Sequence, residues 1–211
     1  MSTTDVFLEK IKWLGHDAFR IDAEKVIYID PYEIGSGPAA DLILITHEHF
    51  DHCSPADVKK IQGENTVVIT ESQSAAKLAG NVRVVKPGET VTEQGVAVEA
   101  VPAYNTDKDF HPRENGWLGF IVTVDGVRVY HAGDTDMIPE MADIDADIAM
   151  LPVSGTYVMT ADQAVEAALT INPKIAVPMH YGSVVGGDAD AEAFRKALEG
   201  KIEVHILPRS S

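Results

Sequence analysis

One short segment places three imidazoles and two carboxylates within six consecutive positions, from His47 to His52. It directly follows residues 41–46, a compact apolar run typical of a strand that is buried on both faces. Packing alone gives no reason for such a cluster. The cluster favours a fold that gathers polar strand ends along one edge, where these side chains can contact residues from distant parts of the chain.

The residue types in this segment are those that bind divalent metal ions. In an irregular turn at a strand end, His47 and His49 can face one ion, while Asp51 and His52 face a second ion nearby. The alternative is a solvated polar turn that binds nothing. The sequence therefore raises the hypothesis of a two-metal site, which needs further ligands from elsewhere.

Two further ligands are found far along the chain. Asp134 lies in Gly-Asp-Thr after a predicted hairpin strand, and His180 lies in Pro-Met-His-Tyr-Gly after another strand. A carboxylate at Asp134 could bridge both ions, and the imidazole of His180 could complete the second position. Taken alone, each would be an ordinary residue at a strand end. Only the pattern as a whole supports a role for them as metal ligands.

Short strands alternate with helices along the chain. Residues 6–13 and 18–21 are predicted to form a hairpin, and residues 161–170 a helix capped by Thr160. Residues 26–30 followed by 41–47 resemble residues 127–134 followed by 147–153. This echo indicates a duplicated β/α unit, with two sheets face to face and helices outside. We expect residues 1–211 to form a single domain.

The charge balance limits the partners. There are 33 acidic residues against 17 Lys and Arg, and the net charge of −16 disfavours nucleic acid. A small-molecule substrate is expected, and bound metal would allow it to be anionic. Cys53 is the only cysteine and the apolar runs are short, so a cytoplasmic location without a membrane span is predicted. The sequence does not indicate an oligomeric state.

The order His-x-His-x-Asp-His, Gly-Asp-Thr and a late strand-end histidine resembles the metallo-β-lactamase superfamily from about residue 12 to residue 207. Trp13-Leu14-Gly15-His16 and the segments around Asp134 and His180 resemble the branch that contains ascorbate-6-phosphate lactonase. The resemblance implies an α+β fold, an αβ/βα four-layer sandwich. It also implies two divalent metal ions at the sheet edge, most often Zn²⁺, with Mn²⁺ or Fe²⁺ in some members.

The sequence departs from the superfamily pattern at one ligand. A metal-binding histidine usually follows the strand that corresponds to residues 98–102, but here that strand runs into Ala103, Tyr104 and Asn105. His111, in the long polar loop that follows, could fold back as a substitute. Alternatively, Asn105 or water fills the position, or His111 is an exposed loop residue.

Several other polar residues are candidates for a supporting role. Asp30 ends a strand and could hold a ligand imidazole through its second nitrogen, while His16 could face the substrate. Tyr181 either lines the pocket or caps the sandwich. We expect His131 to point away from the metals and His205 to be structural.

These patterns predict a metal-dependent hydrolase in which a metal-bound hydroxide attacks an ester-type bond, either a lactone or a phosphodiester of a small molecule. Asp51 would act as the catalytic residue that orients the hydroxide and passes its proton to the leaving group. Two alternatives are a non-catalytic metal-binding or sensor protein, which the absent histidine would allow, and a diiron redox enzyme of the same fold.

Overall fold

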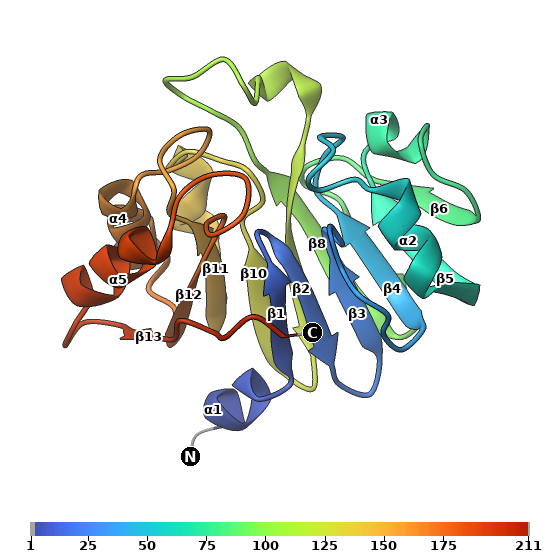
Figure 1. The fold of residues 1–211 in the computed structure, drawn as a ribbon, viewed down its shortest axis with the longest axis horizontal. Helices are drawn as coiled ribbons and strands as arrows, with labels where there is room; N and C mark the ends of the chain where they lie inside the picture. The colour runs from blue at the N-terminus through green and yellow to red at the C-terminus, as the bar shows by residue number, and fades with distance from the viewer. Residues whose placement is uncertain (1–2, 211) are drawn as a thin grey trace.

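Two mixed β-sheets packed face to face form the framework of the protein (Figure 1). The computed structural model describes residues 3–210. The first sheet has the strand order β1-β2-β3-β4-β5-β6. In that order its strands span Ile11–Gly15, Ala18–Asp22, Val26–Ile29, Ala40–Ile45, Gln62–Thr70 and Asn81–Val84.

The second sheet has the strand order β13-β12-β11-β10-β9-β8-β7. In chain order, β7 to β13 span Thr90–Glu93, Val96–Pro102, Leu118–Val124, Val127–His131, Ile148–Pro152, Ile175–Met179 and Glu203–Val204. Each sheet begins with antiparallel strands and then changes to parallel pairing, at β3 with β4 in the first sheet and at β10 with β11 in the second. The two segments that echo each other in sequence therefore occupy equivalent places in the two sheets.

The alternation of side chains along the strands explains why the apolar runs are continuous. Leu42 and Leu44 of β4 belong to the large core that includes both sheets, whereas Ile43 and Ile45 belong to a second cluster with α2 on the outer face. Successive side chains of a strand point to opposite faces, so a strand that is covered on both faces must be apolar throughout. All four of these side chains are fully buried.

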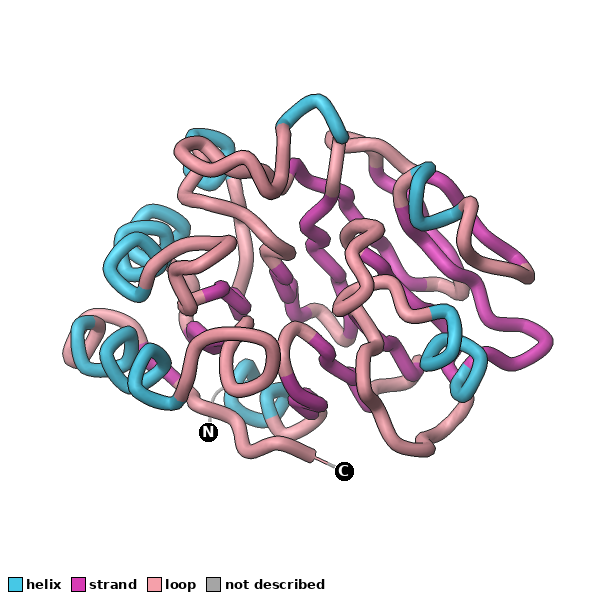
Figure 2. The backbone as a smooth tube through the Cα atoms, turned by 45° about the horizontal axis from the view of Figure 1, so that its top comes forward, coloured by secondary structure: helices cyan, strands magenta, loops and turns pink. Residues whose placement is uncertain are grey.

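Helices cover the outer faces of both sheets (Figure 2). The α-helices α1 to α5 span Thr3–Leu8, Pro55–Ile61, Ser72–Ala75, Ala161–Ile171 and Asp188–Ala197, and the 3-10 turns η1 and η2 span Arg113–Asn115 and Pro139–Asp143. Thr160 and Gln163 form a capping box at the start of α4, as the sequence predicts. Two sheets between outer helices confirm the α+β sandwich. Within residues 3–210, no helix is long and apolar enough to cross a membrane.

The first hairpin is partly different from the sequence prediction. Residues 6–13 were expected to form a strand, but Thr3–Leu8 is a helix and β1 begins only at Ile11. The buried residues of this helix, Thr4, Phe7 and Leu8, have the i, i+3, i+4 spacing of one helical face. Over so few residues, that spacing cannot be distinguished from strand alternation by pattern alone.

Polar residues follow several strands at the edge that lies at the top of Figure 1. Asp30 follows β3, the His47–His52 segment follows β4, Asp134 follows β10 and His180 follows β12. The tip of the β1–β2 hairpin reaches the same edge, and the long loop after β8 rises above it (Figure 1). The topology thus brings the candidate residues of both halves of the chain together.

Candidate metal centre

The first group of candidate ligands combines neighbours in sequence with one residue from the long loop. One nitrogen each of His47, His49 and His111 lies within 4.8 Å of the others. The His47 and His111 ring centroids are 5.1 Å apart, and the Trp117 ring lies 4.8 Å from that of His47. The loop after β8 therefore folds back over the edge and brings His111 beside His47 and His49, although this chain has no histidine directly after β8.

Asn105 supports His111 and does not replace it. Its Oδ1 lies 3.0 Å from His111 Nδ1 and accepts a hydrogen bond from the His111 backbone N–H at 3.0 Å. Its Nδ2 donates to the Tyr157 carbonyl at 2.9 Å. With both ends of the amide occupied, Asn105 fixes the loop and leaves His111 Nε2 directed at Asp134, 3.1 Å from Asp134 Oδ2.

The second group lies deeper and contains more carboxylates. His180 Nε2 is 3.2 Å from Asp134 Oδ2, and His52 Nε2 is 3.4 Å from Asp134 Oδ1. One ligand atom each of Asp17, His52, Asp134 and His180 lies within 4.8 Å of the others. Asp134 thus contacts residues of both groups, which is the arrangement that a bridging carboxylate requires.

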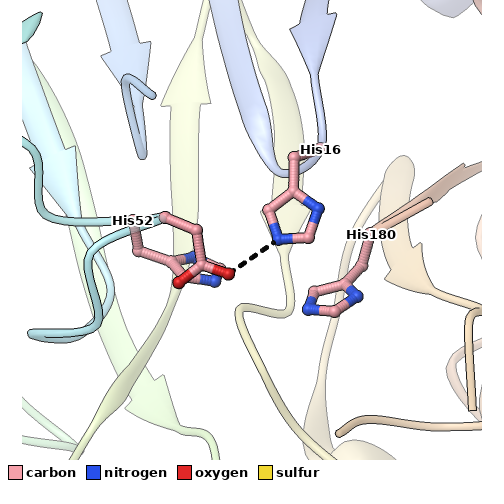
Figure 3. Close-up of side chains that lie close together, drawn as sticks. His16, His52 and His180 are labelled. Carbon is pink, nitrogen blue, oxygen red and sulfur yellow. Dashed lines mark hydrogen bonds and ion pairs between the residues drawn. The ribbon is translucent and has the colours of Figure 1, made fainter. Parts of the chain in front are cut away.

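The hairpin tip brings His16 against this second group. His16 Nε2 is 3.2 Å from Asp51 Oδ2, and the His16 ring centroid lies 4.2 Å from that of His180. Figure 3 shows the His16 ring between His52 and His180. Candidate ligand atoms of Asp51, His16, His52 and His180 also lie within 4.8 Å of one another, so Asp51 faces the same position from the other side.

The ring nitrogens that point away from the centre are held by other polar groups. His52 Nδ1 lies 2.8 Å from Asp30 Oδ2, and His180 Nδ1 lies 2.8 Å from Ser154 Oγ. His47 Nδ1 is 3.0 Å from the hydroxyl of Thr46. Such contacts fix the tautomer and orientation of a metal-binding imidazole, so that its Nε2 is directed at the centre.

Backbone conformations that side chains rarely adopt are found at the same edge. The φ angles of His16, Asp30 and His180 are +51°, +44° and +59°. A residue other than glycine held at positive φ is strained, and such residues are often functional. At Gly133, with φ of +63°, a Cβ would lie 2.6 Å from the Leu118 carbonyl, so the turn that presents Asp134 requires glycine.

The electrostatics reflect close packing of acids and imidazoles. Burial raises the pKa of the Asp134 carboxyl, but His180 and His52 outweigh this and hold the pKa well below its ordinary value. Burial lowers the pKa of His180, but Asp134 and Asp17 raise it to about 9. Burial, with His52 nearby, lowers the pKa of His47 well below its usual range. The second group thus retains protons that a cation would displace.

Unpartnered atoms test whether metal ions fit these residues. The Nε2 atoms of His52, His111 and His180 and Oδ1 of Asp134 are buried and have no hydrogen-bond partner. Most buried polar atoms in proteins are hydrogen-bonded, so several unpaired atoms converging on one place need a ligand. Imidazole nitrogens and carboxylate oxygens are the donors that divalent transition metals bind. The residues therefore fit two divalent metal ions.

The remaining sequence candidates lie outside the centre. His131 Nε2 is 2.9 Å from the backbone carbonyl of Asp17, and its ring packs on Phe19. His205 is near the surface, 2.6 Å from Glu203. Tyr181 does not reach the pocket: its ring is buried and stacks on Trp13 at 4.9 Å.

Two residues of the centre were missed by sequence reasoning. Asp17 follows His16 in the hairpin turn, where an aspartate is ordinary. Ser154 follows β11 by two residues and holds His180. The signal for Asp17 was its position beside His16 in a turn that the sequence already placed at the functional edge. Ser154 gave no signal besides its place after a buried strand.

A cavity of about 210 Å³ opens onto the centre. Its lining residues are His49, Phe50, Asp51, Phe110, His111, Asp134, Tyr157 and Val184. Phe50, Phe110 and Val184 are exposed apolar side chains. Phe110 packs edge-on against Tyr157 with ring centroids 4.7 Å apart, and Phe50 packs edge-on against Tyr32 at 5.8 Å. The cavity therefore has a polar floor and a rim of positioned apolar side chains.

Comparison with known proteins extends over nearly the whole chain. A UPF0173 metal-dependent hydrolase from Archaeoglobus fulgidus is 35% identical over 221 residues, covering 94% of this chain and 95% of the relative. One from Pyrococcus abyssi is 36% identical, with 94% and 96% covered. A crystal structure of a candidate metal-dependent hydrolase from Parabacteroides distasonis has a TM-score of 0.83 and 40% identity, covering 93% of this chain and 91% of that one.

The family model described as the beta-lactamase superfamily domain matches residues 10–180, the part of the chain that includes every ligand candidate named above. The predicted superfamily and its α+β sandwich are confirmed, while the likeness to the ascorbate-6-phosphate lactonase branch stays a prediction. The chain belongs to the β-lactamase superfamily, within the group of UPF0173 metal-dependent hydrolases.

Proposed function

We propose that this protein hydrolyses a neutral carboxylic ester, such as a lactone, of a small apolar molecule with the help of two divalent metal ions. The observation that carries the proposal is the combination of a two-group ligand floor with an apolar cavity rim. When bound, two such ions acidify a water molecule and polarise the oxygen of the bond that is cleaved.

The side chains divide between the two positions by location. The imidazoles of His47, His49 and His111 would hold the first ion. A second ion would be held from the β10 and β12 ends by Asp134 and His180, together with the cluster residues Asp51 and His52. An all-imidazole first position suits zinc, which favours nitrogen and sulfur ligands. We therefore assign Zn²⁺ to the first position in this proposal.

Asp51 is the side chain best placed to move a proton. It lines the cavity, and its Oδ2 contacts His16 Nε2 at 3.2 Å. Burial raises the pKa of Asp51, but His16 and His52 outweigh this and keep the pKa below its ordinary value. The carboxylate is thus ionised at neutral pH, so it can orient an attacking water and carry its proton toward the leaving group.

The charges around the cavity favour a neutral ester over a phosphodiester. The described part of the chain contributes no Lys or Arg to the lining. Two nearby ammonium groups are engaged elsewhere: Lys108 lies 2.5 Å from Asp136, and Lys77 lies 2.9 Å from Glu48. Phosphate recognition usually uses such cations. An anionic substrate would depend on the metal ions alone, whereas the rim offers contact to apolar groups.

The test is a comparison of substrates on protein stripped with chelator and then reloaded with metal. We expect turnover of p-nitrophenyl butyrate and of an aliphatic γ-lactone that depends on added metal and is lost in His49→Ala. His205→Ala, which alters an exposed histidine outside the centre, is the matched control and should keep full activity. Faster turnover of bis(p-nitrophenyl) phosphate than of both esters would overturn the ester assignment.

The small cavity and the single thiol complete the proposal. A volume of about 210 Å³ is below the usual range for drug-sized ligands, which is roughly 300–1,000 Å³, so the substrate is small.

Cys53 is buried and free, which suits a reducing compartment, and we place the protein in the cytoplasm on that ground.

A further inference from the structure

The carboxylate of Asp17 is the most unusual buried group outside the expected ligand set. Asp17 lies at the turn between β1 and β2, and its exposed fraction is 0%. Neither Oδ1 nor Oδ2 has a hydrogen-bond partner. A buried carboxylate without a hydrogen bond is unfavourable, and the only basic groups within 4.0 Å of it in the described part of the chain, His52 and His180, lie at 3.7 and 4.0 Å. The side chain therefore has space for a closer partner.

The distances around Asp17 match shared coordination better than hydrogen bonding. Its Oδ2 lies 3.7 Å from His52 Nε2 and 4.0 Å from His180 Nε2. Both distances exceed the hydrogen-bond range. Two ligand atoms that each lie about 2.1 Å from one ion are separated by roughly 3–4 Å, depending on the angle between them. The Asp17 oxygen is therefore spaced as a ligand of the ion that His52 and His180 face.

No structural role competes for the Asp17 side chain. The backbone carbonyl of Asp17 accepts from His131 at 2.9 Å, but that contact would survive any change of side chain. The nearest carboxylate is that of Asp134, which belongs to the same group of ligand atoms. Two acids so close repel each other unless positive charge lies between them. Among the described residues of the metal-free protein, only the imidazoles of His52 and His180 offset this repulsion, and a bound ion would offset it more directly.

We propose that Asp17 is a direct ligand of the second metal position. It makes that position richer in carboxylate than the first, with Asp17 and Asp134 beside His52 and His180. Oxygen ligands favour Mn²⁺ or Fe²⁺ relative to a site built from imidazoles. The two positions therefore select different ions, Zn²⁺ in the first and Mn²⁺ or Fe²⁺ in the second.

This inference rests on the metal centre but not on the ester chemistry, and its test measures metal binding alone. Chelator-stripped wild type, Asp17→Asn and Asp22→Asn are titrated calorimetrically with Mn²⁺ and with Zn²⁺. Asp22 lies in the same hairpin and pairs with Arg20 away from the centre, so its variant is the matched control. If the protein does not hydrolyse esters but Asp17→Asn loses one ion, the proposed ester hydrolysis is contradicted and the assignment of Asp17 as a ligand is supported.

We expect Asp17→Asn to lose at least roughly tenfold in Mn²⁺ affinity at one position, since even groups behind the ligands carry that much. Zn²⁺ binding at the other position should stay unchanged, and Asp22→Asn should match wild type. Unchanged Mn²⁺ affinity in Asp17→Asn, whatever the melting temperature of the metal-free variant, would show that Asp17 is not a ligand and would overturn the proposal.

A second measurement on wild type keeps the inference testable if Asp17→Asn does not fold. Crystals of the intact protein are grown with Mn²⁺, and the ion is located by anomalous scattering. An ion bound directly should lie about 2.0–2.2 Å from an Asp17 carboxylate oxygen, the range for carboxylate ligands of such metals. A Mn²⁺ ion held by His52 and His180 with Asp17 beyond about 3.2 Å, outside bonding range, would overturn the proposal.

Discussion

The two proposed metal positions differ in the composition of their candidate ligands. The first consists of imidazoles, and two of them, His49 and His111, line the cavity. The second would include His52, His180 and the proposed ligand Asp17, each with an exposed fraction of 0%, together with Asp51 and Asp134, which also line the cavity. The comparison teaches that one edge of a duplicated fold has gathered two unlike groups of candidate ligands: one of imidazoles alone and one that mixes imidazoles with carboxylates.

The residues that deliver the two positions also differ. The first depends on a loop, because His111 is held through Asn105 and reaches the edge only when that loop folds back. The second depends on strand ends and a hairpin turn, which the two sheets fix. We therefore expect the first position to exchange its ion more readily, since local opening starts in loops.

Asp134→Ala should have the largest effect, because this side chain contacts ligands of both positions. We expect loss of the second ion, at least about a hundredfold weaker binding of the first, and ester turnover at background level. Elemental mass spectrometry and turnover of p-nitrophenyl butyrate measure these effects. Two ions retained per chain in the variant would show that the positions do not share this carboxylate.

Asp30→Asn should distinguish the two positions. Asp30 Oδ2 contacts His52 Nδ1 of the second position directly, at 2.8 Å, and reaches His47 of the first position only through the Thr46 hydroxyl. We expect affinity for the second ion to fall by roughly 10–100-fold, the usual effect of groups that orient ligands, while the first position keeps its ion. Calorimetric titration with each metal resolves the two. Equal weakening of both would mean that they act as one cooperative unit.

Phe110→Ala tests the cavity rim without changing a ligand. The Phe110 ring is half exposed, packs on Tyr157 and precedes His111. We expect KM for p-nitrophenyl butyrate to rise about tenfold, in line with about 1.4 kcal/mol of lost apolar contact, with kcat and metal content nearly unchanged. Val6→Ala, on an exposed apolar residue of α1, is the control. A larger loss with p-nitrophenyl acetate than with the butyrate would count against an apolar acyl site.

Asp57 is a carboxylate outside the metal centre, so its substitution shows an effect on stability without an effect on metal binding. Its carboxylate accepts from the Ser54 hydroxyl at 2.7 Å and from Lys60 Nζ at 2.7 Å, at the start of α2. Asp57→Asn should lower the free energy of unfolding by about 1 kcal/mol near neutral pH, the usual effect of losing charge-assisted hydrogen bonds at a helix start. Metal content should not change.

The pH dependence of this contribution follows from the direction of its pKa shift. Burial raises the pKa of Asp57, but Lys60 and Ser54 outweigh it and hold the pKa below the ordinary value. A carboxyl whose pKa is lowered in the folded state stabilises the folded protein fully above its unfolded pKa, near 3.9. This stabilisation is lost as the pH falls through the pKa of the folded state. Urea unfolding from pH 7 to pH 3 should show wild type and Asp57→Asn converging below about pH 4. A constant difference would contradict the assignment.

The sequence predicted best what local patterns determine. The strand before His47, the capped helix at Thr160 and the duplicated β/α unit depend on apolar runs and turn chemistry within short windows, and the structure has all three. The prediction of a strand at the beginning of the chain was wrong, because Thr3–Leu8 is too short for its apolar pattern to distinguish a helix from a strand.

The details of the centre depend on contacts between distant segments. Asp17 is an ordinary turn residue until the hairpin is packed against β10 and β12, and Ser154 gains its contact to His180 only across two strands. Tyr181 is buried by stacking on Trp13, a residue far away in the sequence. Contacts between distant residues cannot be recognised in a short window of sequence. The candidate ligands were therefore easier to find than the residues that orient them.

The most direct test of two unlike metal positions is metal content per chain and metal identity, measured by elemental mass spectrometry on untagged protein purified without chelator. We expect about two ions in wild type, zinc together with manganese or iron, and selective loss of the zinc in His111→Ala. One ion or none, unchanged by the substitution, would contradict the loop ligand and the two-position centre, whereas two irons would redirect the function toward redox chemistry.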